Sequence, residues 1–308
     1  MPPPVQVIFL DAVGTLIQAQ PSVPEVYQRI GRLYGCSLEL EEIERRFRAA
    51  FRRQQEVDRR FAWRTDEDRE RQRWQAIVRE VFVELADTQE LFRTLWQHFA
   101  RADSWTCYPE VADSLARLDA LGFQVGIASN FDQRLRCVCQ GLPALRPCRW
   151  LMISSELGWL KPSRAFFQTI AERLSVAPGR IVYVGDDYET DCLAAQQAGW
   201  HAVWICRHLA VVPTATYPHV RLPSQAEPST PTERKAIKPQ RPAESHRLAD
   251  SEATMASEQT GYHALDQNRR RAGESEVAPT AEPMITRTAE CPVIASLDAL
   301  VPLLDTLA

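Results

Sequence analysis

Lysine is nearly absent from this 308-residue chain, although basic residues are plentiful. Of its 36 basic residues only three are lysine, Lys161, Lys235 and Lys238, and the other 33 are arginine. A lysine is a compact, strongly hydrated point charge, which the broad guanidinium group of arginine does not replace at a small anion. Because Lys235 and Lys238 fall in a proline-rich stretch, Lys161 is the lysine that we expect in a folded, functional part of the chain.

The sequence also lacks the features of several protein classes. Its net charge of −4 gives no basic surface of the kind that nucleic-acid-binding proteins carry, so we expect no nucleic-acid partner. Its eight cysteines have no paired CxxC spacing, which argues against a zinc site and indicates free thiols in a reducing compartment. No apolar run approaches the ~20 residues that a membrane span needs, and the N-terminus lacks the basic start of a signal peptide. We therefore expect a cytoplasmic protein with no membrane partner.

Aromatic residues divide the chain into two unlike parts. All eight Trp and all eleven Phe lie at or before Trp204. Residues 211–290 are instead rich in Pro, Ser, Thr, Glu and Arg, and contain nine of the 21 prolines, so they bury too little to offset the entropy of ordering. We predict a disordered insertion there; the sequence identifies no protein partner for it. Residues 291–308 return to apolar spacing, with Ser296 placed to cap a short helix that packs back on the body.

Short apolar runs alternate with helical spacing in the body. The runs begin at residues 5, 124, 150, 181 and 202, and the segments between them carry apolar residues three or four positions apart. This alternation predicts an α/β protein with a doubly wound parallel sheet, built from residues 1–19, 103–210 and 291–308. Residues 20–102 interrupt the pattern with helical periodicity alone, and their Trp and Phe stripes are typical of a helix-bundle core. They predict an inserted all-helical cap.

Polar residues follow the first four of these runs. In open α/β sheets the ligand crevice lies beyond the carboxyl ends of the strands, so these residues should gather along one edge. They are Asp11 to Thr15 after the first run, Ser129 and Asn130 after the second, Lys161 past the third, and Asp186, Asp187 and Asp191 after the fourth. A single Asp after a strand is often only a helix cap, and GDD is a common turn, but four such groups in order on four strands favour a site.

This set of residues suits chemistry on a small anionic molecule. Asp11 and Asp186 could together hold a hard cation such as Mg²⁺, which takes oxygen ligands and retains waters and substrate phosphate. The metal would reduce the repulsion between a carboxylate nucleophile and an anionic substrate. Ser129 could bind a phosphoryl oxygen, and Lys161 could neutralise developing charge. Thr15 and Asn130 are further candidates for substrate binding.

In this order the segments resemble the motifs of the haloacid dehalogenase (HAD) superfamily of hydrolases. FLDAVGTLI is similar to its first motif, VGIASN to its second, the Lys161-Pro162 pair to its third, and VGDDYETDCLAAQQAGW to its fourth. The helical insert stands where the superfamily carries its C1 cap, and the resemblance covers residues 4–208 and 291–306. PEVYQRIGRLYG, RWQAIVREVF and SNFDQRL further resemble the subgroup that contains haloacid dehalogenase-like hydrolase domain-containing protein 3.

The resemblance implies a Rossmann-like HAD core and a role for each matching residue. Asp11 would be the nucleophile that becomes covalently modified, and Ser129 and Lys161 would bind the phosphate or carboxylate of the substrate. Asp186 would be a magnesium ligand, together with Asp11 and the backbone carbonyl of Val13. Asp191 would be the second acid of the fourth motif and would support Lys161 or the metal shell.

Val13 is where the chain departs from the phosphatases of this superfamily. They carry a second Asp two residues after the nucleophile, which protonates the leaving oxygen and later activates water, and valine can do neither. General acid–base catalysis of this kind contributes typically ~10²–10⁴-fold. We therefore expect a magnesium-dependent phosphatase of a small phosphorylated metabolite that is slow, or limited to leaving groups that need no proton.

Three alternatives address the missing acid. A 2-haloacid dehalogenase expels halide, which needs no proton, but the family's dehalogenases do not require magnesium, and here both Asp186 and Asp191 are present. A phosphonatase forms a Schiff base through a cap lysine, and residues 20–102 contain no lysine. The third alternative is a catalytically weak binding or scaffold protein that uses residues 211–290 as an interaction segment.

Overall fold

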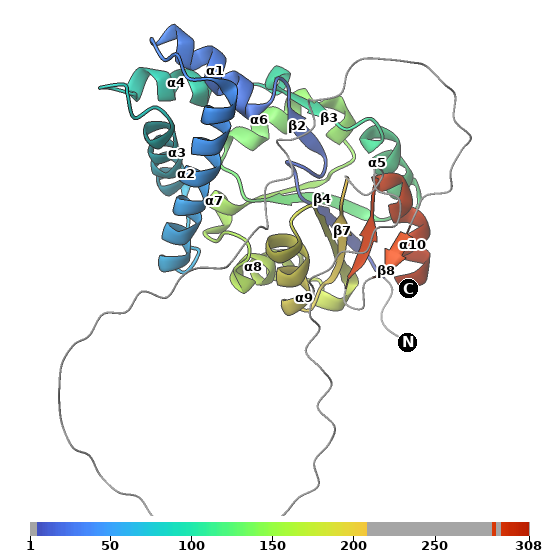
Figure 1. The fold of residues 1–308 in the computed structure, drawn as a ribbon. Helices are drawn as coiled ribbons and strands as arrows, with labels where there is room; N and C mark the ends of the chain where they lie inside the picture. Colours follow the sequence, from blue (N-terminus) through green and yellow to red (C-terminus); the bar gives the residue numbers. More distant parts are fainter. Residues whose placement is uncertain (1–4, 208–284, 288–290, 308) are drawn as a thin grey trace, which may run out of the picture. The chain divides into compact units, whose positions relative to one another are not determined.

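The computed structural model describes residues 5–207, 285–287 and 291–307. Apart from β8 (Ile285–Arg287), the insertion predicted at 211–290 lies outside these residues, and so does the prediction of its disorder. The described residues form an α/β fold with a parallel sheet and an all-helical insert, as the sequence predicts (Figure 1).

Seven strands form the central sheet of the described residues, in the order β5-β4-β1-β6-β7-β9-β8. All neighbours pair in parallel except β8, which runs antiparallel to β9 at one edge. The parallel strands are β1 (Val7–Leu10), β4 (Gln124–Ser129), β5 (Trp150–Ile153), β6 (Ile181–Gly185), β7 (His201–Ile205) and β9 (Pro292–Ile294). The chain leaves β1 for β4 and β5 on one side and returns to β6 on the other. The strand order therefore reverses beside β1, where a ligand crevice is expected.

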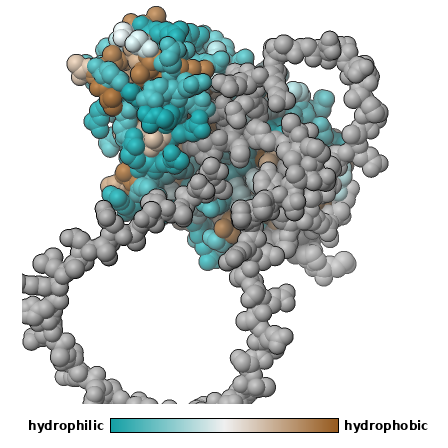
Figure 2. Space-filling view, in the orientation of Figure 1, coloured by the Kyte–Doolittle hydropathy of each residue, from teal (hydrophilic) through white to brown (hydrophobic). Residues whose placement is uncertain are grey.

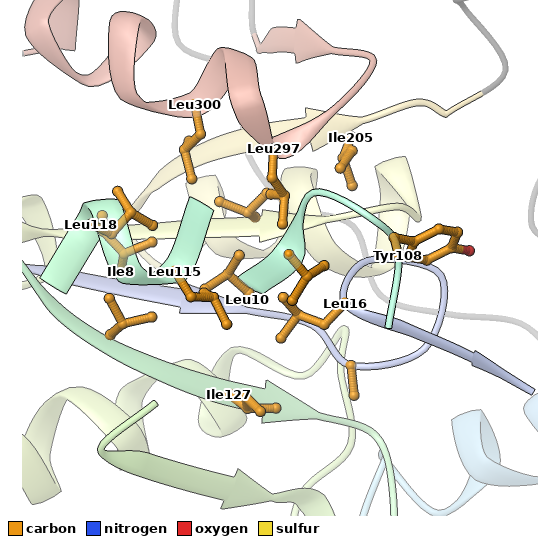
Figure 3. Packing of buried hydrophobic residues seen from close by; sticks show 14 of the residues in the cluster. Ile8, Leu10, Leu16, Tyr108, Leu115, Leu118, Ile127, Ile205, Leu297 and Leu300 are labelled. Carbon is orange, nitrogen blue, oxygen red and sulfur yellow. The ribbon is translucent and has the colours of Figure 1, made fainter. Parts of the chain in front are cut away.

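Both faces of β1 are buried, because successive side chains of a strand point to opposite sides. Ile8 and Leu10 pack with α5 (Val111–Ala120) and α10 (Leu300–Leu307), and Figure 3 labels Leu115 and Leu118 of α5 and Leu300 of α10 in this cluster. Val7 and Phe9 pack on the other side with α8 (Arg164–Leu174) and α9 (Ala194–Gln197). A sheet covered on both faces needs apolar residues at every position, which is why its strands are continuous apolar runs in the sequence.

The C-terminal segment completes the sheet as well as the helical layer. Val293 of β9 pairs in parallel with Trp204 of β7. The sequence analysis did not predict β9, because its three residues are too few to show a period. The predicted cap is present: Ser296 Oγ accepts a hydrogen bond from the backbone N–H of Asp298 at 3.4 Å. A 3₁₀ turn, Leu297–Ala299, precedes α10, and its Leu297 is fully buried.

Four helices make up the insert: α1 (Val23–Leu33), α2 (Leu40–Arg60), α3 (Glu67–Val81) and α4 (Gln89–His98). The carboxylate of Asp66 caps α3 by accepting from the backbone N–H of Arg69 at 2.7 Å. Inside the bundle Tyr27 meets Phe47 edge-on at a centroid distance of 5.2 Å and stacks on Phe82 at 5.9 Å. The aromatic stripes thus build a helix-bundle core, as their spacing predicts.

Two short strands flank the insert at the points where the chain enters and leaves it. β2 (Ile17–Ala19) pairs antiparallel with β3 (Trp105–Cys107). The surface of the insert in Figure 2 is mostly hydrophilic, with hydrophobic side chains gathered where α1 and α4 lie in Figure 1; Leu33 is 76% exposed there. Among the described residues no helix has both the length and the apolar character to cross a membrane.

Candidate active site

The register of the sheet aligns the carboxyl ends of three neighbouring strands. Leu10, the last residue of β1, pairs with Ile127 of β4 and with Val184 of β6. Asp11 directly after β1, Ser129 at the end of β4 and Asp186 directly after β6 therefore lie along one edge of the sheet. Asp11 and Ser129 are buried and Asp186 is half-buried.

Lys161 reaches this edge from the loop that follows α7 (Ser154–Leu157). Its ammonium group donates to Asp11 Oδ1 at 2.8 Å, to Asp191 Oδ1 at 2.6 Å and to the hydroxyl oxygen of Tyr183 at 2.8 Å. The side chain is only 3% exposed. Burial opposes its charge, but the carboxylates of Asp11 and Asp191 outweigh burial and raise the pKa of Lys161 well above its usual value. The lysine is therefore cationic at any physiological pH.

The two acids of the fourth motif come from the turn after β6. Asp191 lies on a π-helical turn, Tyr188–Leu193, an irregularity that is frequent at functional sites. The backbone N–H of Asp187 donates to Asp191 Oδ2 at 3.1 Å, and Thr15 donates its hydroxyl to Asp186 Oδ1 at 3.2 Å. Burial is the main reason that the pKa of Asp186 is raised well above its usual value, and the charges of Asp191 and Asp11 add to it. Burial likewise raises the pKa of Asp191 to about 7, against the opposing charge of Lys161.

Three carboxylates in this cluster can converge on a metal ion. One ligand oxygen each from Asp11, Asp186 and Asp191 lie within 4.8 Å of one another. Three carboxylates against the single charge of Lys161 leave a formal excess of two negative charges, which a divalent cation would neutralise. Carboxylate oxygens with that excess of negative charge suit Mg²⁺ in both donor type and charge. The residues present therefore fit the metal that the sequence predicts.

Val13 occupies a tight turn directly after the first acid. The backbone N–H of Gly14 donates to the carbonyl of Ile17 at 2.9 Å, and Gly14 has a φ of +87°, a conformation that favours glycine. A Cβ added at Gly14 would lie 2.2 Å from Asp186 Oδ2. The Asp186 carboxylate thus packs closely against Gly14 and leaves no space for a side chain there.

Asn130 supports Lys161 and is less available for substrate than the sequence suggests. Its side-chain nitrogen donates to the carbonyl of Lys161 at 2.9 Å, and its side-chain oxygen accepts from the backbone N–H of Lys161 at 2.8 Å. These paired bonds fix the backbone that carries the ammonium group. Ser129 differs, because its hydroxyl makes no hydrogen bond within the part of the chain that the structure describes.

Sequence reasoning missed three residues that contact this cluster. Tyr183 donates its hydroxyl to the carbonyl of Ala128 at 2.6 Å while accepting from Lys161, and burial raises the pKa of Tyr183 well above its usual value. Trp204 donates its indole N–H to the carbonyl of Asp186 at 2.9 Å. Arg207 donates to the carbonyl of Gly14 at 3.0 Å and to that of Thr15. Tyr183 is the single polar residue of its strand, which is a signal; Arg207 is one arginine among 33 and gives none.

The insert touches the core directly before Lys161. The carbonyl of Trp63 accepts from the backbone N–H of Leu160 at 2.8 Å, and the backbone N–H of Thr65 donates to the carbonyl of Gly158 at 3.2 Å. The guanidinium of Arg64 lies over the Trp159 ring, 4.4 Å from its centroid. The loop between α2 and α3 therefore lies beside the segment that presents the ammonium group.

Comparison with known proteins gives consistent matches. A family model described as haloacid dehalogenase-like hydrolase matches residues 5–199. Haloacid dehalogenase-like hydrolase domain-containing protein 3 of Danio rerio is 28% identical over 201 residues, which cover 64% of this chain and 83% of that protein. The L-2-haloacid dehalogenase of Xanthobacter autotrophicus with chloropropionic acid covalently bound has a TM-score of 0.52 at 18% identity, covering 66% of this chain and 78% of that one. The HAD-hydrolase YfnB of Bacillus subtilis bound to magnesium has a TM-score of 0.53 at 16% identity, covering 69% and 93%. At such identities the structural matches show a shared fold.

Proposed function

The chain belongs to the haloacid dehalogenase-like hydrolases, and from that premise we propose that it is a magnesium-dependent phosphatase of a small phosphorylated metabolite. The convergence of Asp11, Asp186 and Asp191 around one lysine carries the proposal. A dehalogenase that releases halide without a metal has no need of the two negative charges that Lys161 leaves unbalanced. A site that binds a divalent cation and a phosphate does need them.

Each residue of the cluster has a part in the proposed reaction. The carboxylate of Asp11 attacks phosphorus, the bond to the leaving oxygen breaks, and an aspartyl phosphate forms that water then hydrolyses. Lys161, held cationic, stabilises the charge on the transferred group, and the Ser129 hydroxyl donates to a phosphoryl oxygen. Magnesium, held by Asp11, Asp186 and the backbone carbonyl of Val13, would supply Lewis-acid stabilisation of the phosphoryl oxygens. Asp191 holds the ammonium of Lys161 in place.

Val13 limits which substrates can react. No carboxylic acid stands two residues after Asp11, so the leaving oxygen departs without a proton from that position. Phenolates and carboxylates leave readily as anions, whereas alkoxides do not. We therefore assign an acyl phosphate, or a phosphate ester with an acidic leaving group, as the substrate class.

A 2-haloacid dehalogenase is the second candidate, and Val13 favours it. Halide needs no proton on departure, so a valine at this position costs that reaction nothing. A scaffold protein without turnover is the third.

One experiment separates the three functions. Purified protein is assayed on p-nitrophenyl phosphate, acetyl phosphate and 2-chloropropionate, each with magnesium and with EDTA, and Asp11→Asn serves as the control for the nucleophile. We expect magnesium-dependent release of phosphate from the first two, abolished in Asp11→Asn. Metal-independent release of chloride would establish the dehalogenase instead. Absence of turnover together with absence of magnesium binding by calorimetry would leave the scaffold.

A further inference from the structure

We propose that Arg207 is a positioning residue for the metal-binding side of the site, an inference that rests on the proposed function. Arg207 follows β7 and is not part of any motif that the sequence analysis identified. Its Nε donates to the carbonyl of Gly14 at 3.0 Å, and its Nη2 donates to the carbonyl of Thr15. One guanidinium group thus holds two consecutive carbonyls of the turn that follows Asp11.

The surroundings of Arg207 fix its own position. Its Nη1 donates to Glu110 Oε1 at 2.6 Å, and its guanidinium carbon lies 3.5 Å from the centroid of the Tyr108 ring. The side chains of Arg207 and Glu110 are only 11% and 12% exposed. Figure 3 shows Tyr108 beside the loop after β1, on the side away from the leucines of α5. A side chain that is buried, stacked and charge-paired in this way is held in one geometry.

The turn that Arg207 holds sets the position of Asp186. Thr15 donates its hydroxyl to Asp186 Oδ1, and Gly14 packs so tightly against the same carboxylate that a methyl group there would overlap it. Trp204, three residues before Arg207, donates to the backbone carbonyl of Asp186. The end of β7 therefore holds Asp186 from two directions, through its backbone by Trp204 and through its side chain by the turn.

A lysine can take over only part of this role. The three nitrogens of the planar Arg207 guanidinium donate hydrogen bonds to two carbonyls and one carboxylate. The ammonium group of a lysine, on a flexible chain, does not reproduce the spacing of these donors. The two cations therefore have different tasks: Lys161 contacts the carboxylates of Asp11 and Asp191, and Arg207 holds backbone carbonyls in place.

The test compares Arg207→Gln and Arg207→Lys with Arg149→Gln, which removes an exposed arginine whose ion pair with Asp119 lies elsewhere. Partners that orient a metal ligand typically change metal affinity by about 10–100-fold when they are removed. We expect the Kd of Mg²⁺, measured by calorimetry, to rise by about that factor in Arg207→Gln and by less in Arg207→Lys. At saturating magnesium the kcat for p-nitrophenyl phosphate should return to within a few-fold of the unaltered protein, which a general loss of folding would not allow.

Hydrogen exchange supplies a readout that needs neither metal nor turnover. In Arg207→Gln the amides of residues 11–17 should exchange faster than in the unaltered protein, while those of α8 keep their protection. Equal exchange of residues 11–17 and an unchanged Kd for Mg²⁺, both matching Arg149→Gln, would overturn the proposal. If the unaltered protein binds no magnesium, the proposed function fails, and the exchange of residues 11–17 still decides whether Arg207 positions the turn.

Discussion

The ammonium nitrogen of Lys161 lies 2.8 Å from Oδ1 of Asp11. The same nitrogen also donates to Asp191 and Tyr183, so all three of its N–H bonds are used and aimed in fixed directions. A cation at this distance lowers the cost of bringing an anion to the Asp11 carboxylate.

Lys161→Arg should abolish turnover although it keeps the charge. The pocket around the ammonium is buried and already filled by three acceptors, so the larger planar guanidinium cannot enter without displacing one of them. We expect kcat for p-nitrophenyl phosphate to fall by at least about 100-fold, in the range of losses from removing an electrostatic stabiliser. Lys235→Arg is the matched control, since it makes the same exchange at a lysine that no motif includes. Retention of a tenth or more of the activity by Lys161→Arg would contradict the assignment.

Gly14→Ala and Gly35→Ala form a second matched pair. Both glycines have φ near +85°, at +87° and +84°, so alanine is strained by a similar amount, roughly 1–2 kcal/mol, at either place. Only at Gly14 does the new methyl group overlap Asp186; at Gly35 nothing lies within 4 Å. Backbone strain should lower the thermal stability of both variants, but Gly14→Ala alone should weaken magnesium binding, by about tenfold or more. Equal Kd values for Mg²⁺ in the two variants would show that Asp186 does not depend on this turn.

Sequence reasoning identified the candidate site from residues at the ends of strands, but it missed the residues that support them. Asp11, Ser129 and Asp186 were identifiable because each follows a buried apolar run, and parallel strands bring such residues to one edge. Arg207 also follows a strand, but its role depends on which backbone carbonyls its guanidinium group can reach. The sequence pattern does not contain those distances. The sequence analysis missed β9 for another reason: it is three residues long, and its pairing with β7 and β8 is what makes it a strand.

Val13→Asp should raise activity on poor leaving groups. An aspartate two residues after the nucleophile could protonate an alkoxide as it leaves, a contribution of typically ~10²–10⁴-fold, of which an unadapted pocket will recover part. We expect at least a tenfold gain in kcat/KM on an alkyl phosphate such as glycerol phosphate, with little change on p-nitrophenyl phosphate. Val13→Asn introduces the same shape without an acid and should show no gain. An equal gain from Asn and Asp would assign the effect to polarity instead of proton transfer.

Magnesium should bind more tightly as the pH rises. Burial, together with the neighbouring acids, raises the pKa of Asp186, and burial raises that of Asp191 to about 7, so protons compete with the metal in the acidic range. Calorimetry at pH 6 and pH 8 should give a lower Kd at the higher pH. Asp191→Asn removes one of the two carboxylates whose protonation competes with the metal, so the Kd of Mg²⁺ should depend less on pH. A Kd that is constant from pH 6 to pH 8 in the unaltered protein would refute the prediction.

The last prediction concerns stability and rests on Glu70, a buried acid of the insert. Glu70 is 1% exposed; it accepts from the hydroxyl of Thr65 at 2.7 Å and lies 3.5 Å from Arg73. Burial is the main cause that raises its pKa, and the charges of Asp132 and Asp58 add to the rise while Arg73 opposes it. Folded Glu70 therefore binds its proton more tightly than unfolded Glu70.

The sign of the pH effect follows from that difference. Between the usual pKa of glutamate and the raised one, the folded state holds more protons, so the free energy of unfolding falls as the pH rises through this window. Glu70→Gln keeps the shape and removes the ionisation, so it should be more stable than the unaltered protein at pH 7 and lose that advantage as the pH falls toward 4. Glu84→Gln is the control of opposite sign, because Arg46 holds the pKa of the Glu84 carboxyl below its usual value and the substitution removes a stabilising charge. Thermal melts of both variants at several pH values test these two predictions. If Glu70→Gln lowers the melting temperature at pH 7 and this loss shrinks toward pH 4, the charge of Arg73 outweighs burial.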